Sequence, residues 1–197
     1  MPRTDEILDK LGGTWYLTTT DLTKDYWQVP LDPEARANSA FTTPMGLLEW
    51  LVLPFGLKGV PPTFQHLVDQ LLKGMEDFAL AYIDDICVFS QTWEEHVFQV
   101  KRVLGRLHDA VLTVKAGKCK VGMAEVQYLS HKVGSSHLKS EPAKVEAIKD
   151  WPSPQTNKQA QASIGTASYY RRLVPHFSSL AAPLTELCRE GKPDKVV

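Results

Sequence analysis

The sequence predicts an α+β domain, in which strands and helices share one core, followed by a small helical subdomain. An apolar run interrupted by two aspartates, "AYIDDICVFS" at 81–90, has the composition of a buried strand or a tight hairpin. Amphipathic helices are expected on both sides of it, and helical patterns replace strands after residue 138. With 197 residues, 43% of them hydrophobic, the chain can bury a core of this kind.

The first two elements are a short helix and a strand. The segment "TDEILDKLGG", residues 4–13, predicts a short helix, because Thr4 can cap it, acidic residues occupy its first turn and Gly12-Gly13 stop it. Residues 15–22, "WYLTTTDL", are rich in β-branched and aromatic residues and predict a strand. Asp21 falls where this strand runs into a loop.

Two more strands and a helix are expected next. Residues 39–53 predict two strands joined at Pro44-Met45-Gly46. A loop rich in glycine and proline then leads into a helix with Pro61 and Pro62 at its start, where a missing N–H costs least. The residues predicted to form its buried face are Phe64, Leu67, Val68, Leu71 and Leu72.

The aspartate-containing run is followed by a helix and a strand. Thr92 and Glu95 form a capping box at the start of the helix. The stripe predicted to face the core consists of Val97, Val100, Leu104, Leu107 and Val111. Residues 125–134, "EVQYLSHKVG", predict a further strand.

From Leu138 onward the chain is predicted to be helical and basic. Ser140 can cap a first helix, and Thr156 with Gln159 can cap a second. Prolines separate these helices and a third, shorter one. The sequence therefore predicts a small helical subdomain attached to the α+β domain.

Charge is distributed unevenly along the chain. Residues 1–97 hold 6 Lys/Arg and 15 Asp/Glu, a net charge of −9, whereas residues 98–197 hold 16 and 8, a net of +8. An acidic half joined to a basic half fits a metal site beside a surface that binds a polyanion. Ordinary variation of surface charge explains the split equally well.

The cysteines and the apolar segments indicate the setting of the protein. Three cysteines far apart in the sequence argue against a disulfide framework and a compact zinc site. We therefore expect a reducing, intracellular and cytoplasmic location. No stretch is long and apolar enough for a signal peptide or a membrane span, so no membrane partner is expected.

The candidate catalytic residues are Asp21, Asp84 and Asp85, each at an expected strand end or hairpin tip. Brought together, three carboxylates raise one another's pKa, and a divalent cation such as Mg²⁺ relieves the repulsion. Two such cations can clamp the attacking and leaving oxygens of a phosphoryl transfer. The alternative is a polar turn and a strand-end cap, although this turn lacks the glycine usual in two-residue hairpins.

Longer segments around these aspartates carry a family resemblance. "AYIDDICVFSQTWEEHVFQVKRVL" resembles the Tyr-x-Asp-Asp hairpin, and "TTDLTKDYWQVPL" the first catalytic strand, of reverse transcriptases of gypsy-like long-terminal-repeat retrotransposons and retroviruses. "LPFGLKGVPPTFQHLVDQLL" resembles their template-side loop and helix, and "LTVKAGKCKVGMAEVQYLSHKVG" their later palm segments with the primer grip. "KVEAIKDWPSPQTNKQAQASIGTASYYRRLVPHFSSLAAPLTEL" is similar to the start of their thumb. The likeness is collinear over nearly the whole chain.

The resemblance implies a fold and an activity. Residues 1–137 would be the palm of a right-hand polymerase, an antiparallel sheet with helices, and residues 138–197 a partial thumb and the start of the connection. About twenty residues precede Asp21, so most of the fingers are expected to be missing, as are the connection and RNase H domain. The implied activity is RNA-directed DNA synthesis as part of a Pol polyprotein, with particle association in the parent element. The alternative is a catalytically inactive retroelement remnant that at most binds nucleic acid.

The same resemblance implies partners and metal ligands. The partners would be an RNA or DNA template–primer duplex and deoxynucleoside triphosphates. Asp21, Asp84 and Asp85 would hold two Mg²⁺ ions, for which Mn²⁺ can substitute. Lys118 corresponds to a lysine proposed to protonate the leaving pyrophosphate, and a solvated surface lysine is the alternative.

Other residues receive binding roles by the same resemblance. Those implied to contact the nucleotide or template are Tyr26, Phe55, Gly56, Pro61 and Tyr82. Those implied to form the primer grip are Tyr128, Leu129 and His131. Arg171 and Arg172 would contact duplex phosphates, and an exposed basic helix end explains them almost as well.

Several residues depart from the family pattern. Asp25 stands where the family usually has glycine, and Val60 and Pro62 replace small alanines. Val111 and Ser130 also stand at common glycine positions. If those glycines adopt a positive φ, each replacement costs on the order of 1–2 kcal/mol. These departures fit the inactive alternative.

Overall fold

The computed structural model describes residues 4–134, 139–140, 152–171 and 174–188. The chain folds as two compact units, residues 1–138 and 139–197. The first unit contains the four-stranded sheet and carries all three candidate catalytic aspartates, and the second is mainly helical.

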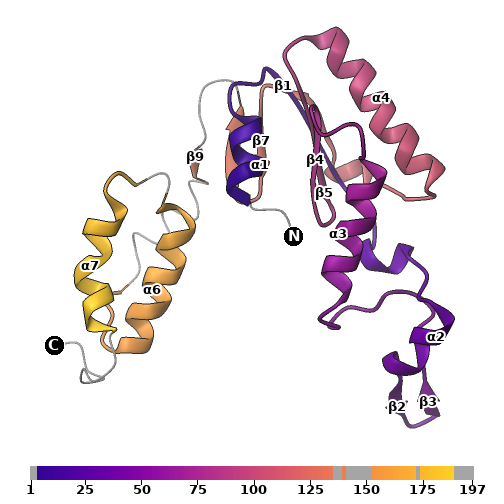
Figure 1. Cartoon of the computed structure of the whole chain (residues 1–197), viewed down its shortest axis with the longest axis horizontal. Helices are drawn as coiled ribbons and strands as arrows, with labels where there is room; N and C mark the ends of the chain where they lie inside the picture. Colours follow the sequence, from indigo (N-terminus) through magenta and orange to yellow (C-terminus); the bar gives the residue numbers. More distant parts are fainter. Residues whose placement is uncertain (1–3, 135–138, 141–151, 172–173, 189–197) are drawn as a thin grey trace. The chain divides into compact units, whose positions relative to one another are not determined.

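A four-stranded antiparallel sheet forms the centre of the first unit, with the strand order β4-β5-β1-β6. Figure 1 labels three of its strands, β1, β4 and β5. Its strands are β1 (Tyr16–Asp21), β4 (Ala79–Tyr82), β5 (Asp85–Ser90) and β6 (Lys120–Met123). The long hydrophobic run predicted around 81–90 is therefore a hairpin of β4 and β5, and β5 and β1 are the two central strands.

Both faces of the sheet are covered. On one face Ile86 and Val88 of β5 join the core formed with α3 (Val60–Leu71) and α4 (Trp93–Asp109). On the other face Cys87 and Phe89 join a core formed with α1 (Thr4–Leu11) and with a hairpin. The two strands of this hairpin are β7 (Glu125–Tyr128) and β8 (His131–Gly134). Because successive side chains of β5 are buried on opposite faces, its sequence is continuously apolar rather than alternating.

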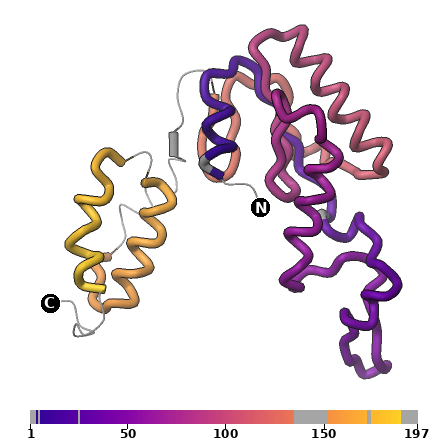
Figure 2. Tube along the Cα trace, viewed as in Figure 1, coloured from indigo at the N-terminus to yellow at the C-terminus, as the bar shows by residue number. Residues whose placement is uncertain are grey.

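A second hairpin lies away from the sheet. Figure 2 shows the chain leaving the sheet after β1 and returning as α3, and β2 and β3 lie within this excursion. Its elements are η1 (Asp25–Gln28), α2 (Pro33–Arg36), η2 (Ala37–Ser39), β2 (Phe41–Thr43) and β3 (Gly46–Leu48). The expected pair of strands joined at Pro44-Met45-Gly46 is confirmed, since Thr43 pairs with Gly46.

Local signals located two of the helices correctly. Pro61 lies in the first turn of α3, and Phe64, Val68 and Leu72 are buried as predicted. Thr92 Oγ1 accepts a hydrogen bond from Glu95 N, as the capping box at the start of α4 requires. Among the described residues, no helix is both long enough and apolar enough to cross a bilayer.

The buried stripe of α4 agrees only in part with the prediction, since Leu107 is buried and Val100 packs against the core as expected. Val97, Leu104 and Val111 are exposed instead, whereas His96 and Val103 are buried. The His96 ring contacts Thr18 Oγ1 through Nε2 at 2.7 Å and Ser90 Oγ through Nδ1 at 2.6 Å. These hydrogen bonds make burial of a histidine favourable, and a pattern of apolar residues alone therefore does not identify His96 as a buried position.

Residues 125–134 also differ from the prediction, since they form two strands rather than one. β7 and β8 pair with Tyr128 opposite His131, and the turn consists of Leu129 (φ 47) and Ser130 (φ 61). A two-residue turn of this kind normally requires glycine or asparagine, so its sequence signal is absent here.

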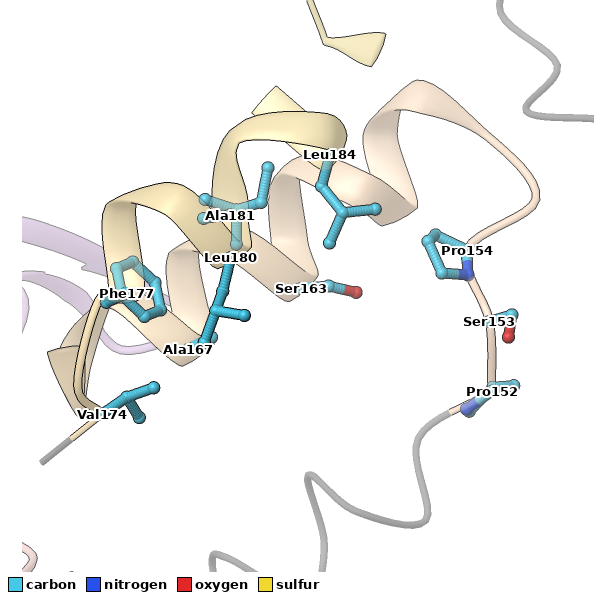
Figure 3. Close-up of a pocket in the computed structure, with 11 residues that line it drawn as sticks. Pro152, Ser153, Pro154, Ser163, Ala167, Val174, Phe177, Leu180, Ala181 and Leu184 are labelled. Atoms are coloured by element: carbon cyan, nitrogen blue, oxygen red, sulfur yellow. The ribbon is translucent and has the colours of Figure 1, made fainter. Parts of the chain in front are cut away.

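The second unit contains β9 (Lys139–Ser140), α6 (Asn157–Tyr169) and α7 (Phe177–Leu187). Thr156 accepts a hydrogen bond from Gln159 N, which confirms the predicted start of α6. An apolar hollow of about 430 Å³ lies between the two helices and the segment 152–154 (Figure 3). The helix predicted from Ser140 falls mostly outside the described residues.

Candidate active site

The three candidate catalytic aspartates come together at one end of the central strands. Asp21 ends β1 and pairs with Asp85 at the start of β5, and Asp84 lies in the two-residue turn between β4 and β5. One carboxylate oxygen from each of the three residues lies within 4.8 Å of the others. Backbone pairing alone thus brings together residues that are 63 positions apart in the sequence.

Burial and mutual repulsion perturb this cluster. Loss of solvent raises the pKa of the half-buried Asp84, and the neighbouring Asp21 carboxylate raises it further. Backbone hydrogen bonding at Asp84 and the positive charge of Lys118 oppose the rise. The cluster therefore favours a nearby positive charge.

Lys118 supplies such a charge. Its Nζ donates to Asp21 Oδ2 at 2.7 Å, and the lysine comes from η3 (Ala116–Lys118). Lys118 and Tyr128 line a hollow of about 350 Å³ together with Asp21 and Asp85. The buried Thr20 hydroxyl, for which no hydrogen-bond partner is found among the described residues, lines the same hollow.

The donor set fits a hard divalent cation. Three carboxylates offer oxygen ligands only, which is the chemistry that Mg²⁺ prefers. The site is open and polar enough for water and phosphate oxygens to complete a coordination sphere, as Mg²⁺ sites usually require. The structure brings Asp21, Asp84 and Asp85 together, as the sequence predicted.

The turn that carries Asp84 is held by a residue that sequence reasoning missed. Gln65 of α3 is 1% exposed, and its Oε1 accepts from Ile83 N at 2.7 Å. Its Nε2 donates to Ala81 O at 3.2 Å and to Asp69 Oδ1 at 2.8 Å. The i, i+4 spacing of Gln65 and Asp69 was visible in the sequence, but the contact with the hairpin was not.

Ile83 explains why the turn requires this support. Its φ of 57° lies in the left-handed region, which is unfavourable for a β-branched residue. Such a conformation costs on the order of 1–3 kcal/mol and persists only where surrounding contacts stabilise it. The hydrogen bonds of Gln65 on both sides of Tyr82 provide that stabilisation.

The β7–β8 hairpin connects to the site through Tyr128. The buried Tyr128 hydroxyl donates to Asp85 O at 3.0 Å, and burial raises its pKa well above the ordinary value. His131 is also buried, and its Nδ1 lies 2.8 Å from Leu129 O. Tyr128, one of the residues expected in the primer grip, is therefore joined directly to the backbone of an aspartate of the cluster.

The residues expected to contact nucleotide or template fall in several places. Tyr26 packs between Phe55 and Phe64, with ring centroids 5.0 and 5.2 Å away. Gly56 follows Phe55 with a φ of 95°, and Tyr82 pairs with Asp85 at the end of β4. Tyr26 and Phe55 form one aromatic surface, and Gly56 permits a turn that other residues rarely adopt.

The two arginines belong to the second unit. Arg171 is exposed and lines a hollow with Glu186. Arg172 lies outside the described residues. Their role in phosphate binding remains a prediction.

A palm-like sheet with three clustered carboxylates defines the class of nucleotidyl-transferring polymerases, and comparison with known proteins specifies the family. Residues 1–133 match the family "Reverse transcriptase (RNA-dependent DNA polymerase)". This chain belongs to the reverse transcriptase family.

Relatives of the chain are retroelement polyproteins. It is 37% identical over 191 residues to the Pol polyprotein from transposon 297 of Drosophila melanogaster, covering 96% of the chain and 18% of that protein. It is 33% identical over 190 residues to the Pol polyprotein from transposon gypsy of the same organism, with 96% and 18% covered. The chain thus spans less than a fifth of these relatives, and the predicted resemblance to gypsy-like elements is confirmed.

Solved structures of foamy viral protease-reverse transcriptase share the fold. A form in complex with double-stranded DNA superposes with a TM-score of 0.91 at 26% identity, covering all of this chain and 35% of that chain. A form in complex with RNA/DNA hybrid gives a TM-score of 0.85 at 26% identity, with 99% and 27% covered. The palm-and-thumb fold class predicted from the sequence is confirmed.

Proposed function

We propose that this chain is a polymerase core that extends a primer on an RNA or DNA template. The observation that carries the proposal is the cluster of Asp21, Asp84 and Asp85, with carboxylate oxygens within 4.8 Å. In this proposal residues 1–137 are the palm and residues 138–197 begin the thumb. The primer 3′-oxygen forms a bond to the α-phosphorus of a deoxynucleoside triphosphate while the bond to pyrophosphate breaks.

The three carboxylates would hold two Mg²⁺ ions, or Mn²⁺ in their place. When bound, these ions would lower the pKa of the primer hydroxyl and neutralise charge on the transferred phosphate. The residues of the chain supply the positioning: β1–β5 pairing sets Asp21 against Asp85, and Tyr128 holds the backbone of Asp85. Groups that are held in position before the reaction, and that stabilise the charge of the transition state, usually make a large contribution to the rate enhancement of an enzyme.

We propose a template–primer duplex and deoxynucleoside triphosphates as partners. The foamy viral relatives bind double-stranded DNA and RNA/DNA hybrid, which supports duplex binding by this chain. Arg171 would contact phosphates, so binding should weaken steeply as salt rises. We also propose an intracellular, cytoplasmic location in the particle of the parent element, which three free thiols support.

A competing function is duplex binding without synthesis. Val111 and Ser130, at positions where the family commonly has glycine, have φ values of 58° and 61°. The strain predicted for a residue other than glycine at a positive φ therefore applies at both positions, and it makes the polymerase core less stable. Salt-sensitive duplex binding without nucleotide incorporation would support this function.

Primer extension tests the proposal. The purified chain is given a primer on an RNA template or on a DNA template, with Mg²⁺ or Mn²⁺, beside the double variant Asp84→Asn, Asp85→Asn. The exposed Asp109→Asn is the matched control for loss of a carboxylate. Metal-dependent extension that is lost only in the double variant is expected; equal extension by the double variant would refute the proposal.

A further inference from the structure

A lysine side chain lies directly on the carboxylate cluster. Lys118 Nζ is 2.7 Å from Asp21 Oδ2, and the lysine side chain is 56% exposed whereas that of Asp21 is 19% exposed. The carboxylate is thus the more buried partner of the pair, and the ammonium is the partner that lies mostly in solvent. Exposed ion pairs of this kind are weak and exchangeable.

The backbone brings Lys118 to this place. Lys115 N donates to Asp21 O at 2.8 Å, and Thr23 N donates to Thr113 O at 2.8 Å. Lys118 N in turn donates to Lys115 O at 2.9 Å. The segment that carries the lysine is therefore anchored to the strand end that carries the aspartate, although the two residues are 97 positions apart.

An ammonium and a divalent cation compete for the same carboxylate. In the absence of a cation, three carboxylates this close repel one another, and the Lys118 charge partly offsets the repulsion at Asp84 as well. When a cation of charge +2 binds to Asp21, it takes the place of the ammonium at that carboxylate, and the two positive charges repel each other. Both effects act against metal binding while the lysine remains at Asp21.

We propose that Lys118 is an intramolecular counter-ion that stabilises the metal-free site and leaves Asp21 when a divalent cation binds. The inference rests on the proposed function, because it requires the three carboxylates to bind such cations. Displacement then leaves the ammonium at the wall of the hollow, where a triphosphate would bring negative charge. Metal binding and exposure of a cation to the substrate are thereby coupled.

Metal affinity measures the competition without any turnover. Mn²⁺ dissociation constants are obtained by titration with electron paramagnetic resonance for the intact chain and for Lys118→Met. Removal of the competitor is expected to tighten Mn²⁺ binding about twofold to fivefold, given the strength of exposed pairs. This ratio should shrink as ionic strength rises, because salt already weakens the pair.

Two further variants separate the possible results. Lys120→Met removes the same charge from the wall of the same hollow, and its expected change is less than about twofold because the ion pair stays intact. Asp21→Asn should lose most Mn²⁺ binding. Melting temperatures of the metal-free proteins verify folding, and the rise caused by Mn²⁺ should be largest for Lys118→Met.

The outcomes are distinguishable. Tighter binding by Lys118→Met but not by Lys120→Met supports the counter-ion role. Unchanged or weaker binding by Lys118→Met, or equal tightening in both lysine variants, overturns it while the metal site stands. Equal Mn²⁺ binding by the intact chain and Asp21→Asn overturns the metal site of the proposed function, and the counter-ion role with it.

Discussion

Replacing Gln65 with leucine tests whether this buried amide holds the turn that carries Asp84. Gln65→Leu preserves the size of the side chain and removes its hydrogen bonds to Ile83 N and Ala81 O. These two backbone groups lie on either side of Tyr82, immediately before Asp84. The substitution therefore acts on the backbone of the turn and leaves the carboxylates themselves unchanged.

The magnitude follows from the groups left without partners. A buried backbone group that loses its hydrogen bond costs about 1–3 kcal/mol. The Ala81 carbonyl is buried and the Ile83 amide is half-buried, so the free energy of unfolding should fall by about 2–4 kcal/mol. This is a large fraction of the 5–15 kcal/mol typical of a domain.

The assay combines urea unfolding with Mn²⁺ titration and primer extension. Gln70→Leu, an exposed residue of the same helix, is the control and should change stability by less than about 0.5 kcal/mol. If the turn relaxes from the positive φ of Ile83, extension by folded Gln65→Leu should fall about tenfold to a hundredfold, since misplacement of about 1 Å has effects of this size. A stability loss no larger than that of Gln70→Leu, with unchanged Mn²⁺ affinity, would refute the positioning role.

Three further predictions concern other contacts. Tyr128→Phe removes the hydrogen bond to Asp85 O and should lower stability by about 0.5–1.5 kcal/mol in urea unfolding, with weaker Mn²⁺ binding; unchanged values would show that the hydroxyl is dispensable. Val111 adopts a φ of 58° at the end of α4, where Leu112 N donates to Leu107 O. Val111→Gly should therefore raise the free energy of unfolding by about 0.5–1 kcal/mol, because glycine adopts this φ without strain. The control Val121→Gly in β6 should lower the free energy of unfolding. Burial lowers the pKa of His96 below its ordinary 6.5, so the unfolded state binds more protons and stability should fall as pH drops through the region of 6.5. In His96→Asn this part of the pH dependence should be absent from urea titrations at pH 5.5 and 7.5; an identical pH profile would contradict the assignment.

Much of the fold was predictable because its signals are local. The capping box at Thr92, the prolines at the start of α3 and the Thr156 cap each act within one helical turn, so sequence spacing identifies them. The local pattern alone missed the hairpin of β7 and β8, because Leu129 and Ser130 occupy a turn that usually carries glycine. The buried face of α4 was displaced because hydrogen bonds to Thr18 and Ser90 stabilise His96 in the core.

The sequence by itself indicated which residues are the candidates for the chemistry and to which family the chain belongs. Asp21, Asp84 and Asp85 are identifiable because the motifs around them are contiguous and keep their order. Only the tertiary structure decided which residues support them, because pairing of β1 with β5 and packing of α3 are long-range events. Gln65 meets Ile83 across 18 positions and Lys118 meets Asp21 across 97, and separations of this size leave no periodic or local signal in the sequence.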